Sequence, residues 1–410
     1  MSVGMSLVAA MGITVGAASL PAAIRWATYG GGVRPPFART AATTTAIALA
    51  LTACSADETP SPTSSSSTSS AATSSQPTTS SSSTTAPAPR VTGAPASLTA
   101  AVAKKYGRSP LRGKASLGTW RGAKVAVVTA GDDATFAVRP KGRQGWKVVG
   151  GWWPSLGATR GKADVGGSRH VLVIGSDARE GQDVEHSRAD AIQLLGVDGV
   201  GGAGLMGFAR DLWVPIPGHG EGKLNSSMVF AGPSGQTESV SSVSGIDADG
   251  YVVTGFDGFK AIVDDLGGLN FMAPKAMDSH LSGGQVKKGY NHLDGMEALA
   301  WSRERKTLPG GDFDRSRNQG LLLASAAIQA RLRGPGALPE ALTVIDEHAS
   351  SNLSAEEMLL FTAAFFRVNP AQVGHAVAKG PTGMQSGQSI VRLDEDSRRA
   401  FRDFRDGRLS

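Results

Sequence analysis

The chain has 410 residues, enough for two or three domains, and its formal net charge is +6 at pH 7. Three of the excess cations, Arg25, Arg34 and Arg39, lie in the first 53 residues, which contain no acidic residue. The rest of the chain has only a small positive excess, so its charge does not require a nucleic acid or another polyanion as partner.

Residues 1–54 have the pattern of an export signal. Arg34 and Arg39 precede an uncharged run over residues 41–51, and the sequence LTAC follows, ending in the single cysteine, Cys54. This order predicts a bacterial lipoprotein signal in which Cys54 is lipidated and begins the mature chain. The alternative is an ordinary buried thiol, but a cysteine between an apolar run and a polar linker has no core around it.

A second, weakly apolar run over residues 3–24 is long enough to span a bilayer. A spanning helix ahead of a lipoprotein signal would be redundant, and a start of translation at Val33 would remove it. We therefore expect the protein in the cell envelope, on the extracellular face of the plasma membrane and anchored by lipid at Cys54.

The next two segments differ sharply in composition. Residues 55–98 are mostly Ser, Thr, Pro and Ala, which predicts a disordered linker. Residues 99–160 contain the β-rich runs KVAVVTAG, ATFAVRP and GWKVVGGWW, which predict a small β-rich accessory domain. Trp146, Trp152 and Trp153 could form a sugar-binding platform, but aromatic residues in a small sheet more often form its core.

Residues 168–335 begin with three apolar strands in RHVLVIGSDAR, HSRADAIQLLGVD and GLMGFARDLWV. The glycine-rich stretch between the last two predicts a hairpin. In an antiparallel meander, Asp177 ends the first strand, Asp190 begins the second and Arg210 ends the third. All three then lie on one edge of the sheet.

Helical patterns follow these strands. Asp257 and Asp294 are predicted N-caps of two helices, and a third helix begins near Asp312 or Asp314 and ends before Gly334. The alternation of strands and helices predicts an α/β core with a mixed central β-sheet flanked by helices, over residues 168–335.

Residues 336–410 predict a C-terminal α/β extension. Ser354 and Glu357 form a predicted capping box at the start of one helix, and SIVRL predicts a short strand near the end.

Basic side chains gather around the same predicted edge. Two arginines lie two residues apart after one helix, an arginine and a glutamine share a face of the next, and three further cations complete the set: Arg303, Arg305, Arg315, Gln319, Arg188, Arg210 and Lys223. Arginine suits bidentate binding of phosphate oxygens, and the two carboxylates of Asp177 and Asp190 suit one Mg²⁺. The set predicts a phosphate site, although any one member alone would be a common surface ion pair.

Other chemistries find little support in the sequence. The seven histidines form no H-E-x-x-H motif, and there is no Walker A loop, no G-x-G-x-x-G after a strand and no G-x-S-x-G elbow. These absences argue against a zinc peptidase, ATP hydrolysis, dinucleotide redox chemistry and serine hydrolysis.

Six blocks follow one another in unbroken order between about Arg169 and Leu332: VLVIGSDARE, HSRADAIQLLGVD, ARDLWVPIPGHGEGKLNSS, GFDGFKAIVDDLGGL, NHLDGMEALAWSRERK and GDFDRSRNQ. Together they resemble the LytR-CpsA-Psr family of cell-wall glycopolymer ligases. The tail resembles the extension of actinobacterial members. The chain departs from the family pattern at Ala191, where threonine is usual, at Asn318, where glutamine is common, and in its lipoprotein-type signal.

The resemblance implies a phosphotransferase that moves a glycan from a polyprenyl-pyrophosphate carrier to a peptidoglycan hydroxyl and leaves a phosphodiester link. Asp177 and Asp190 would hold magnesium, and the pyrophosphate would be bound by Arg210, Lys223, Arg303, Arg305, Arg315 and Gln319. Arg188 and Asp211 also match the family pattern. The general base would be Asp177 or Asp211, between which the sequence does not choose.

The prenyl chain needs an apolar channel, for which the candidates, equally compatible with ordinary core packing, are Phe259, Ile262, Val263, Leu321, Leu322 and Leu323. Arabinogalactan, a teichoic acid and a capsular polymer are all compatible with the sequence as the glycan. Two alternatives use the same fold: a pyrophosphatase that hydrolyses the carrier lipid, and a non-catalytic wall-binding scaffold. A DNA-binding regulator is excluded if the protein is exported.

Overall fold

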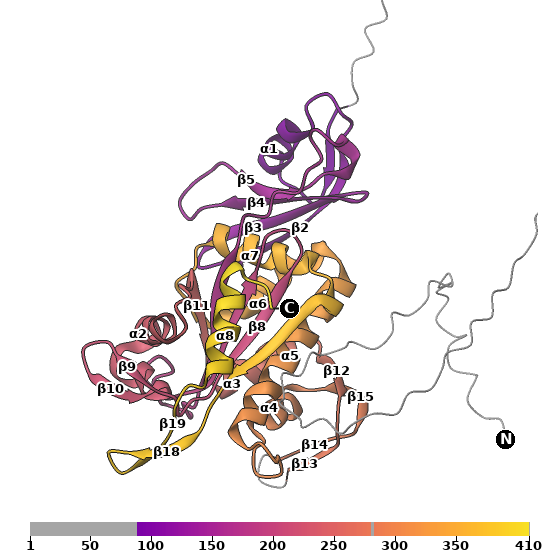
Figure 1. The fold of residues 1–410 in the computed structure, drawn as a ribbon. Helices are drawn as coiled ribbons and strands as arrows, with labels where there is room; N and C mark the ends of the chain where they lie inside the picture. The colour runs from indigo at the N-terminus through magenta and orange to yellow at the C-terminus, as the bar shows by residue number, and fades with distance from the viewer. Residues whose placement is uncertain (1–87, 280–282, 410) are drawn as a thin grey trace, which may run out of the picture. The chain divides into compact units, whose positions relative to one another are not determined.

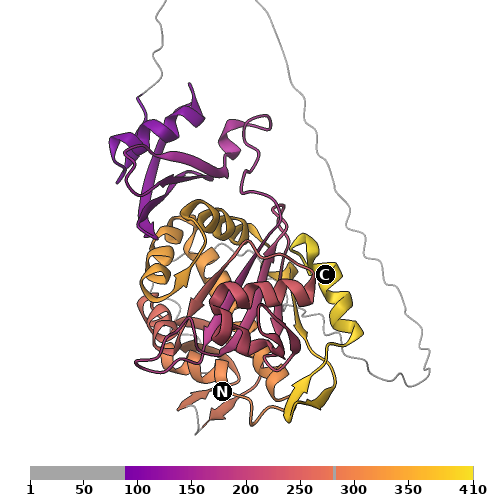
Figure 2. The same cartoon turned by 90° about the vertical axis from the view of Figure 1, so that its left-hand side faces the viewer.

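The computed structural model describes residues 88–279 and 283–409 (Figures 1 and 2). The expected export signal, Cys54 and the linker as far as residue 87 lie outside these residues. Among the helices of the described ranges, none combines the length and the apolar character needed to cross a bilayer.

The described chain begins with a five-stranded sheet, here called the N-terminal sheet, and one helix, α1 (Ala96–Tyr106). Its strands follow chain order: β1 (Arg90–Thr92), β2 (Arg112–Trp120), β3 (Ala123–Ala130), β4 (Asp133–Arg139) and β5 (Lys147–Trp152). The β-rich character expected of this region is therefore confirmed. Trp153 is 1% exposed and its Nε1 donates to Oγ1 of Thr135 at 2.8 Å, which confirms core packing for this tryptophan.

The boundary expected at residue 99 is wrong, because β1 and most of the first turn of α1 lie within the segment 55–98 expected to be disordered. Leu98, Val102 and Tyr106 of this helix are buried against the N-terminal sheet. The helix begins after Pro95 without a side-chain cap, so the sequence carries no start signal at this point.

A second, six-stranded sheet, here called the central sheet, has the order β16-β11-β6-β7-β8-β17. The three middle strands form the expected antiparallel meander, while β11 is parallel to β6 and β17 is parallel to β8. The sheet is therefore mixed, as expected. Its strands are β6 (Arg169–Ser176), β7 (Ala189–Val197), β8 (Ala203–Phe208), β11 (Gly250–Thr254), β16 (Ser350–Ser351) and β17 (Val373–Ala378).

Helices cover both faces of the central sheet (Figures 1 and 2). One face packs on α2 (Ser227–Ser244) and α8 (Glu395–Asp403). The other lies under α3 (Phe256–Asp265), α5 (Asp312–Arg333), α6 (Leu338–His348) and α7 (Ala355–Arg367), with α4 (Gly295–Arg303) beside α3 and α5.

The expected helix caps have mixed outcomes. Asp294 caps α4 in a capping box with Glu297, and Ser354 caps α7 in a capping box with Glu357, as expected. The cap expected at Asp257 is wrong: α3 starts directly after β11, Gly255 takes the N-cap position, and Asp257 lies in the first turn.

Residues 336–410 are integrated into the central sheet rather than appended to it. The strands β16 and β17 form its two edges, and α6 and α7 cover one of its faces. The strand expected at SIVRL is present as β19 (Gln388–Val391), which pairs with β18 (Thr382–Gln385). The other ribbons pair β9 (Trp213–Ile216) with β10 (Gly220–Lys223), β12 (Leu269–Ala273) with β15 (Gly289–Leu293), and β13 (Met277–Ser279) with β14 (Gly284–Val286).

Candidate active site

The predicted polar residues meet at one edge of the central sheet. Asp177 directly follows β6, Asp190 is the second residue of β7, and Arg210 lies two residues beyond β8. Because β7 is antiparallel to both neighbours, these three positions share one edge, as the sequence predicted. The backbone carbonyl of Arg210 accepts a hydrogen bond from the N–H of Asn225 at 3.0 Å, which fixes the start of the following loop.

A β-bulge places Asp190. Ser176 pairs with Ala189 and Gly175 pairs with Ala191, so Asp190 is an extra residue without a partner on β6. Its carbonyl is thereby released from the strand ladder and accepts hydrogen bonds from Nη2 of Arg315 at 3.0 Å and Nε2 of Gln319 at 3.5 Å. The bulge thus allows two side chains of α5 to bond directly to the backbone at the start of β7.

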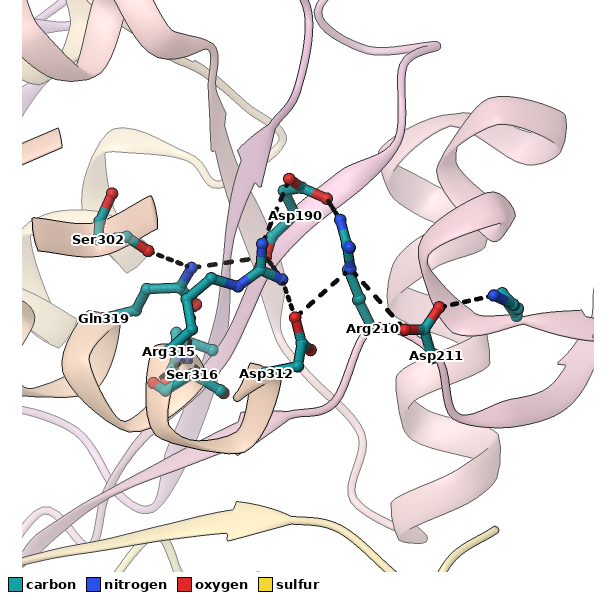
Figure 3. A network of polar contacts seen from close by, with 10 residues as sticks. Asp190, Arg210, Asp211, Ser302, Asp312, Arg315, Ser316 and Gln319 are labelled. Atoms are coloured by element: carbon teal, nitrogen blue, oxygen red, sulfur yellow. Dashed lines mark hydrogen bonds and ion pairs between the residues drawn. The ribbon is translucent and has the colours of Figure 1, made fainter. Parts of the chain in front are cut away.

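Two arginines share the carboxylate of Asp190 (Figure 3). Nη1 of Arg210 lies 2.5 Å from Oδ1, and Nη1 of Arg315 lies 3.4 Å from Oδ2. Asp190 and Arg210 are each about a fifth exposed, whereas the Arg315 side chain is 5% exposed. A carboxylate between two guanidinium groups is a strong, charge-assisted arrangement, and it holds both arginines at the strand end.

Asp312 is a member of this site that the sequence analysis treated only as a helix start. Its Oδ1 lies 2.8 Å from Nη2 of Arg315 and 3.5 Å from Nε of Arg210. Asp312 therefore bridges the two arginines from below, opposite Asp190 (Figure 3). The position one turn before Arg315, at the start of α5, was the available signal. We call Asp190, Arg210, Asp312 and Arg315 the acid–arginine cluster.

Burial and charge act differently on the two arginines. Burial alone would lower the pKa of Arg210, but the attraction of Asp190, Asp312 and Asp211 raises it above its ordinary value. Burial lowers the pKa of Arg315, and repulsion from Arg210 and Arg305 adds to this, against the opposing effect of the carboxylates. Both remain cationic near neutral pH, so the buried Arg315 would be stabilised by a further anion.

A second ion pair extends the cluster along the sheet edge. Oδ1 of Asp211 lies 2.9 Å from Nζ of Lys223, and Oδ2 lies 4.0 Å from Nε of Arg210. Lys223 ends β10, so the β9–β10 ribbon delivers this cation to the site. The structure therefore links the predicted residues Lys223 and Asp211 to the acid–arginine cluster.

Four other predicted residues lie around the cluster without an ion pair to it. Asp177 accepts the backbone N–H of Arg188 on Oδ1 at 2.9 Å, and the Arg188 side chain is exposed. The guanidinium of Arg303, the last residue of α4, lies 4.5 Å from the ring centre of Phe256. Arg305 is exposed and close enough to affect the pKa of Arg315.

A buried row of polar side chains supports Gln319 from behind. Its Nε2 donates to the carbonyl of Ser302 at 3.1 Å. Its Oε1 lies 3.4 Å from Nε2 of Gln193, which also donates to the carbonyl and the hydroxyl of Ser316. Gln193, Ser316 and Gln319 are each at most 8% exposed, so the position of α5 over β7 is fixed by directional bonds.

Two members of the acid–arginine cluster, Asp190 and Arg315, line a cavity of about 400 Å³, here called the apolar pocket. Asp190, Arg303, Arg315 and Gln319 line it, but most of its lining is apolar and comes from the central sheet and from α3, α5, α6 and α7. Five of the six residues expected along an apolar channel line it: Phe259, Ile262, Val263, Leu322 and Leu323. The sixth, Leu321, does not line it and packs instead against the core formed by α4 and the β12–β15 ribbon, in agreement with the core-packing alternative.

The site offers few protein ligands for a metal ion. Within residues 88–279 and 283–409 no three Asp, Glu, His or Cys side chains gather as a metal site. Asp177 and Asp190 lie at the ends of neighbouring strands, so they supply two carboxylates at one edge. This matches Mg²⁺, which proteins commonly hold with one or two carboxylates while water and substrate phosphates complete the shell.

Comparison with known proteins gives the family. A family model described as the LytR_cpsA_psr family matches residues 155–403, more than half of the chain. The chain belongs to the LytR-CpsA-Psr family. The match runs past residue 335, in agreement with β16 and β17 completing the central sheet.

Curated relatives match parts of the chain. The regulatory protein MsrR of Staphylococcus aureus (strain COL) is 33% identical over 156 residues, which are 37% of this chain and 46% of MsrR. The probable cell wall biosynthesis protein LcpB of Corynebacterium glutamicum is 31% identical over 180 residues, 40% of this chain and 43% of LcpB. The matches thus span less than half of these two relatives.

A third relative carries an enzyme name. The polyisoprenyl-teichoic acid–peptidoglycan teichoic acid transferase TagU of Enterococcus faecalis is 29% identical over 232 residues, 55% of this chain and 74% of TagU. The chain is thus homologous to a cell-wall glycopolymer transferase.

Solved structures share the fold. TagV of Bacillus subtilis aligns with a TM-score of 0.50 at 23% identity, over 59% of this chain and 99% of TagV. A Streptococcus agalactiae protein aligns with a TM-score of 0.52 at 16% identity, over 60% of this chain and 90% of its own. At these identities the likeness concerns the fold alone, and it agrees with the α/β architecture described above.

Proposed function

We propose that the protein is a phosphotransferase that joins a glycan to peptidoglycan, with a polyprenyl-pyrophosphate-linked glycan as donor. The observation that carries the proposal is the apolar pocket with Asp190 and Arg315 of the acid–arginine cluster at its wall and Arg210 paired with Asp190 beside them. A pyrophosphate attached to a long hydrocarbon needs cations and apolar walls in one site, and this cavity offers both. Family membership and the homology to TagU support the same reaction class.

In the proposed reaction the acceptor hydroxyl attacks the phosphorus that carries the glycan. A new P–O bond forms to the acceptor, the P–O bond of the pyrophosphate breaks, and polyprenyl phosphate leaves. The hydroxyl proton passes to a carboxylate, either Asp177 or Asp211. The pyrophosphate supplies the free energy of the transfer, so no nucleotide is required.

Arg210 and Arg315 would stabilise the charge on the phosphoryl oxygens. Both guanidinium groups are already held in position by the carboxylates of Asp190 and Asp312. Phosphate oxygens of the donor would take the place of one of these carboxylates, and the arginines would not have to be repositioned for the reaction. Further donors around the pyrophosphate would come from Gln319, Lys223, Arg303 and Arg305. Arg188 would add another from the exposed side of β7.

We propose Mg²⁺ as cofactor, held by Asp177 and Asp190. When bound, it would neutralise charge on the phosphate oxygens. Both carboxylates already have partners in this chain, since Asp177 accepts the N–H of Arg188 and Asp190 binds two arginines. These partners would orient the two side chains toward the strand edge.

The test uses the full chain, a polyprenyl-pyrophosphate-linked glycan and magnesium, with and without peptidoglycan, and identifies the phosphorus-containing products. The proposal expects glycan joined to peptidoglycan through a phosphodiester. Free glycan phosphate and polyprenyl phosphate in the presence of acceptor would establish a pyrophosphatase instead. Tight lipid binding without turnover would establish a scaffold.

We further propose that the protein is held on the outer face of the plasma membrane by a lipid on Cys54. Cys54→Ala should move the protein from the membrane to the soluble extracellular fraction, which cell fractionation measures. Continued membrane retention of this variant would contradict lipid anchoring and would favour the apolar run over residues 3–24.

A further inference from the structure

Helix α6 has two neighbours on adjacent faces. Leu338, Ala341, Leu342 and Ile345, at helical spacing, line the apolar pocket. A second row one residue further on contains Pro339, Thr343 and Asp346, and it faces β2 of the N-terminal sheet and the turn after it. The same helix is thus a wall of the pocket and a contact surface for the N-terminal sheet.

Directional bonds fix the position of α6 against this sheet. The backbone N–H of Thr119 donates to Oγ1 of Thr343 at 2.8 Å, and that of Arg121 donates to Oδ1 of Asp346 at 2.8 Å. These donors are backbone groups at the end of β2 and in the turn after it. The position of the helix is therefore set by the main chain of the sheet.

The contact is close because Gly118 has no side chain. A Cβ at this position would lie 2.1 Å from the carbonyl oxygen of Pro339 and 2.6 Å from its carbonyl carbon. These are backbone atoms of the first turn of α6, so they cannot move without moving the helix. Gly118 lies in a β-strand and does not have the positive φ that would by itself require glycine.

Helix α7 likewise lines the apolar pocket and contacts the N-terminal sheet. Phe361, Phe365 and Phe366 line the apolar pocket. The ring of Phe366 also stacks on Trp152 of β5, with centres 5.8 Å apart and planes 10° from parallel. Helices α6 and α7 lie beside the N-terminal sheet (Figure 1). Two neighbouring walls of the pocket are therefore in contact with this sheet.

We propose that the N-terminal sheet sets the width of the apolar pocket through α6 and α7, and thereby selects the length of the prenyl chain that the site accepts. The identity of the ligand rests on the proposed function above; the coupling of the sheet to the pocket wall rests on the contacts just described. Close-packed interiors transmit small displacements, so a shift of α6 changes the space available to the chain.

The test is the variant Gly118→Ala, which pushes the first turn of α6 away from β2. The full chain in detergent is titrated with farnesyl diphosphate as the short probe and undecaprenyl diphosphate as the long probe. We expect the affinity ratio of long to short probe to fall about tenfold, the loss expected when two methylene groups no longer fit.

Gly113→Ala is the matched control. Gly113 lies in the same strand, but a Cβ there would lie 2.6 Å from the carbonyl oxygen of Thr129, within the N-terminal sheet itself. Thermal unfolding of both variants measures their general destabilisation. Only Gly118→Ala should change the affinity ratio.

Trp152→Ala provides a second, independent variant. Loss of the stacked ring frees Phe366, so the pocket should widen and discriminate less between the two probes, and Trp152→Phe should restore the ratio. Equal ratios in wild type, Gly118→Ala and Trp152→Ala would overturn the inference. A wild-type protein that binds neither probe would instead overturn the proposed function, so the two failures are distinguishable.

Discussion

Two carboxylates in this protein are removed from solvent in different ways. Asp133, at the start of β4, is 1% exposed and accepts three hydrogen bonds, from the hydroxyl of Tyr106 at 2.7 Å and from the hydroxyl and backbone N–H of Ser155 at 2.5 and 2.9 Å. Asp190 is about a fifth exposed and is held by two arginines. The first group is a closed network of neutral donors, whereas the second lies at the wall of a cavity.

The difference is clearest in what each network leaves unbonded. Among the described residues, Nε of Arg210 and Nε of Arg315 are buried atoms that form no hydrogen bond. A closed network serves stability, while buried guanidinium N–H groups without a hydrogen bond have capacity for an incoming anion. Mutations should therefore distinguish the two networks. Changes in the Asp133 network should lower the stability of the fold, and changes in the acid–arginine cluster should lower turnover.

The largest expected effect is that of Arg210→Ala on turnover. Loss of one preorganised cation at the phosphoryl group should lower kcat by about 10²- to 10³-fold. The fold should remain, since Arg315 still pairs with Asp190, and circular dichroism measures this. Arg317→Ala is the matched control, because Arg317 lies on the same helix as Arg315 but pairs with Asp314 at the surface. Unchanged kcat in Arg210→Ala would remove this arginine from the site.

Asp312→Asn should have the next largest effect. Asp312 touches both arginines but, in the proposed reaction, not the reacting atoms, so its loss should misplace them and lower kcat by up to about 10²-fold. The substitution keeps the size of the side chain. Partial rescue by Asp312→Glu would indicate a positioning role, whereas equal loss in both variants would indicate that the exact carboxylate position matters more than its charge.

Tyr106→Phe tests the closed network. Burial and the neighbouring Asp133 raise the pKa of Tyr106 above its usual range, so its hydroxyl remains a donor at neutral pH. Removing a buried hydrogen bond to a charged acceptor should lower the free energy of unfolding by about 2 kcal/mol and leave kcat unchanged. Tyr290→Phe is the control, because this hydroxyl bonds Asn270 on an exposed ribbon. A loss of activity in Tyr106→Phe without a loss of stability would break the comparison.

The smallest effect is expected at the exposed ion pair between Lys147 and Glu356. Nζ of Lys147 lies 2.8 Å from Glu356, and the two side chains are 64% and 40% exposed. Lys147→Ala should change the free energy of unfolding by less than about 1 kcal/mol, because solvent screens such pairs. A double-mutant cycle with Glu356→Ala measures the interaction. A coupling free energy above about 1 kcal/mol would show that the Lys147–Glu356 ion pair stabilises the position of α7 more than its exposure suggests.

The sequence predicted the strand edge well because the pattern there is local. Each of the three middle strands is an apolar run bounded by polar or glycine-rich residues, and the hairpin between β7 and β8 fixes their antiparallel order. The placement of Asp177, Asp190 and Arg210 follows from that order alone. The caps at Asp294 and Ser354 were equally readable, since a capping box is a short-range pattern.

The features that the sequence did not reveal depend on distant contacts. The bulge at Asp190 is visible only once β6 is paired with β7, and the bridge from Asp312 to Arg210 joins α5 to the end of β8. Residues 336–410 were predicted as an extension because nothing local indicates that β16 and β17 are edges of the central sheet. Helix α2, which was not predicted, is rich in serine and contains Pro233 after the non-helical Gly232.

The single extra residue at Asp190 also limits how this strand can change in length. Deleting one residue of β7 at this point would restore regular pairing with β6 while leaving the buried pattern from Ile192 onward intact. The sheet would close more regularly, yet the aspartate that holds both arginines would be lost or would turn to the opposite face. Folding and catalysis therefore place opposite demands on the length of this strand.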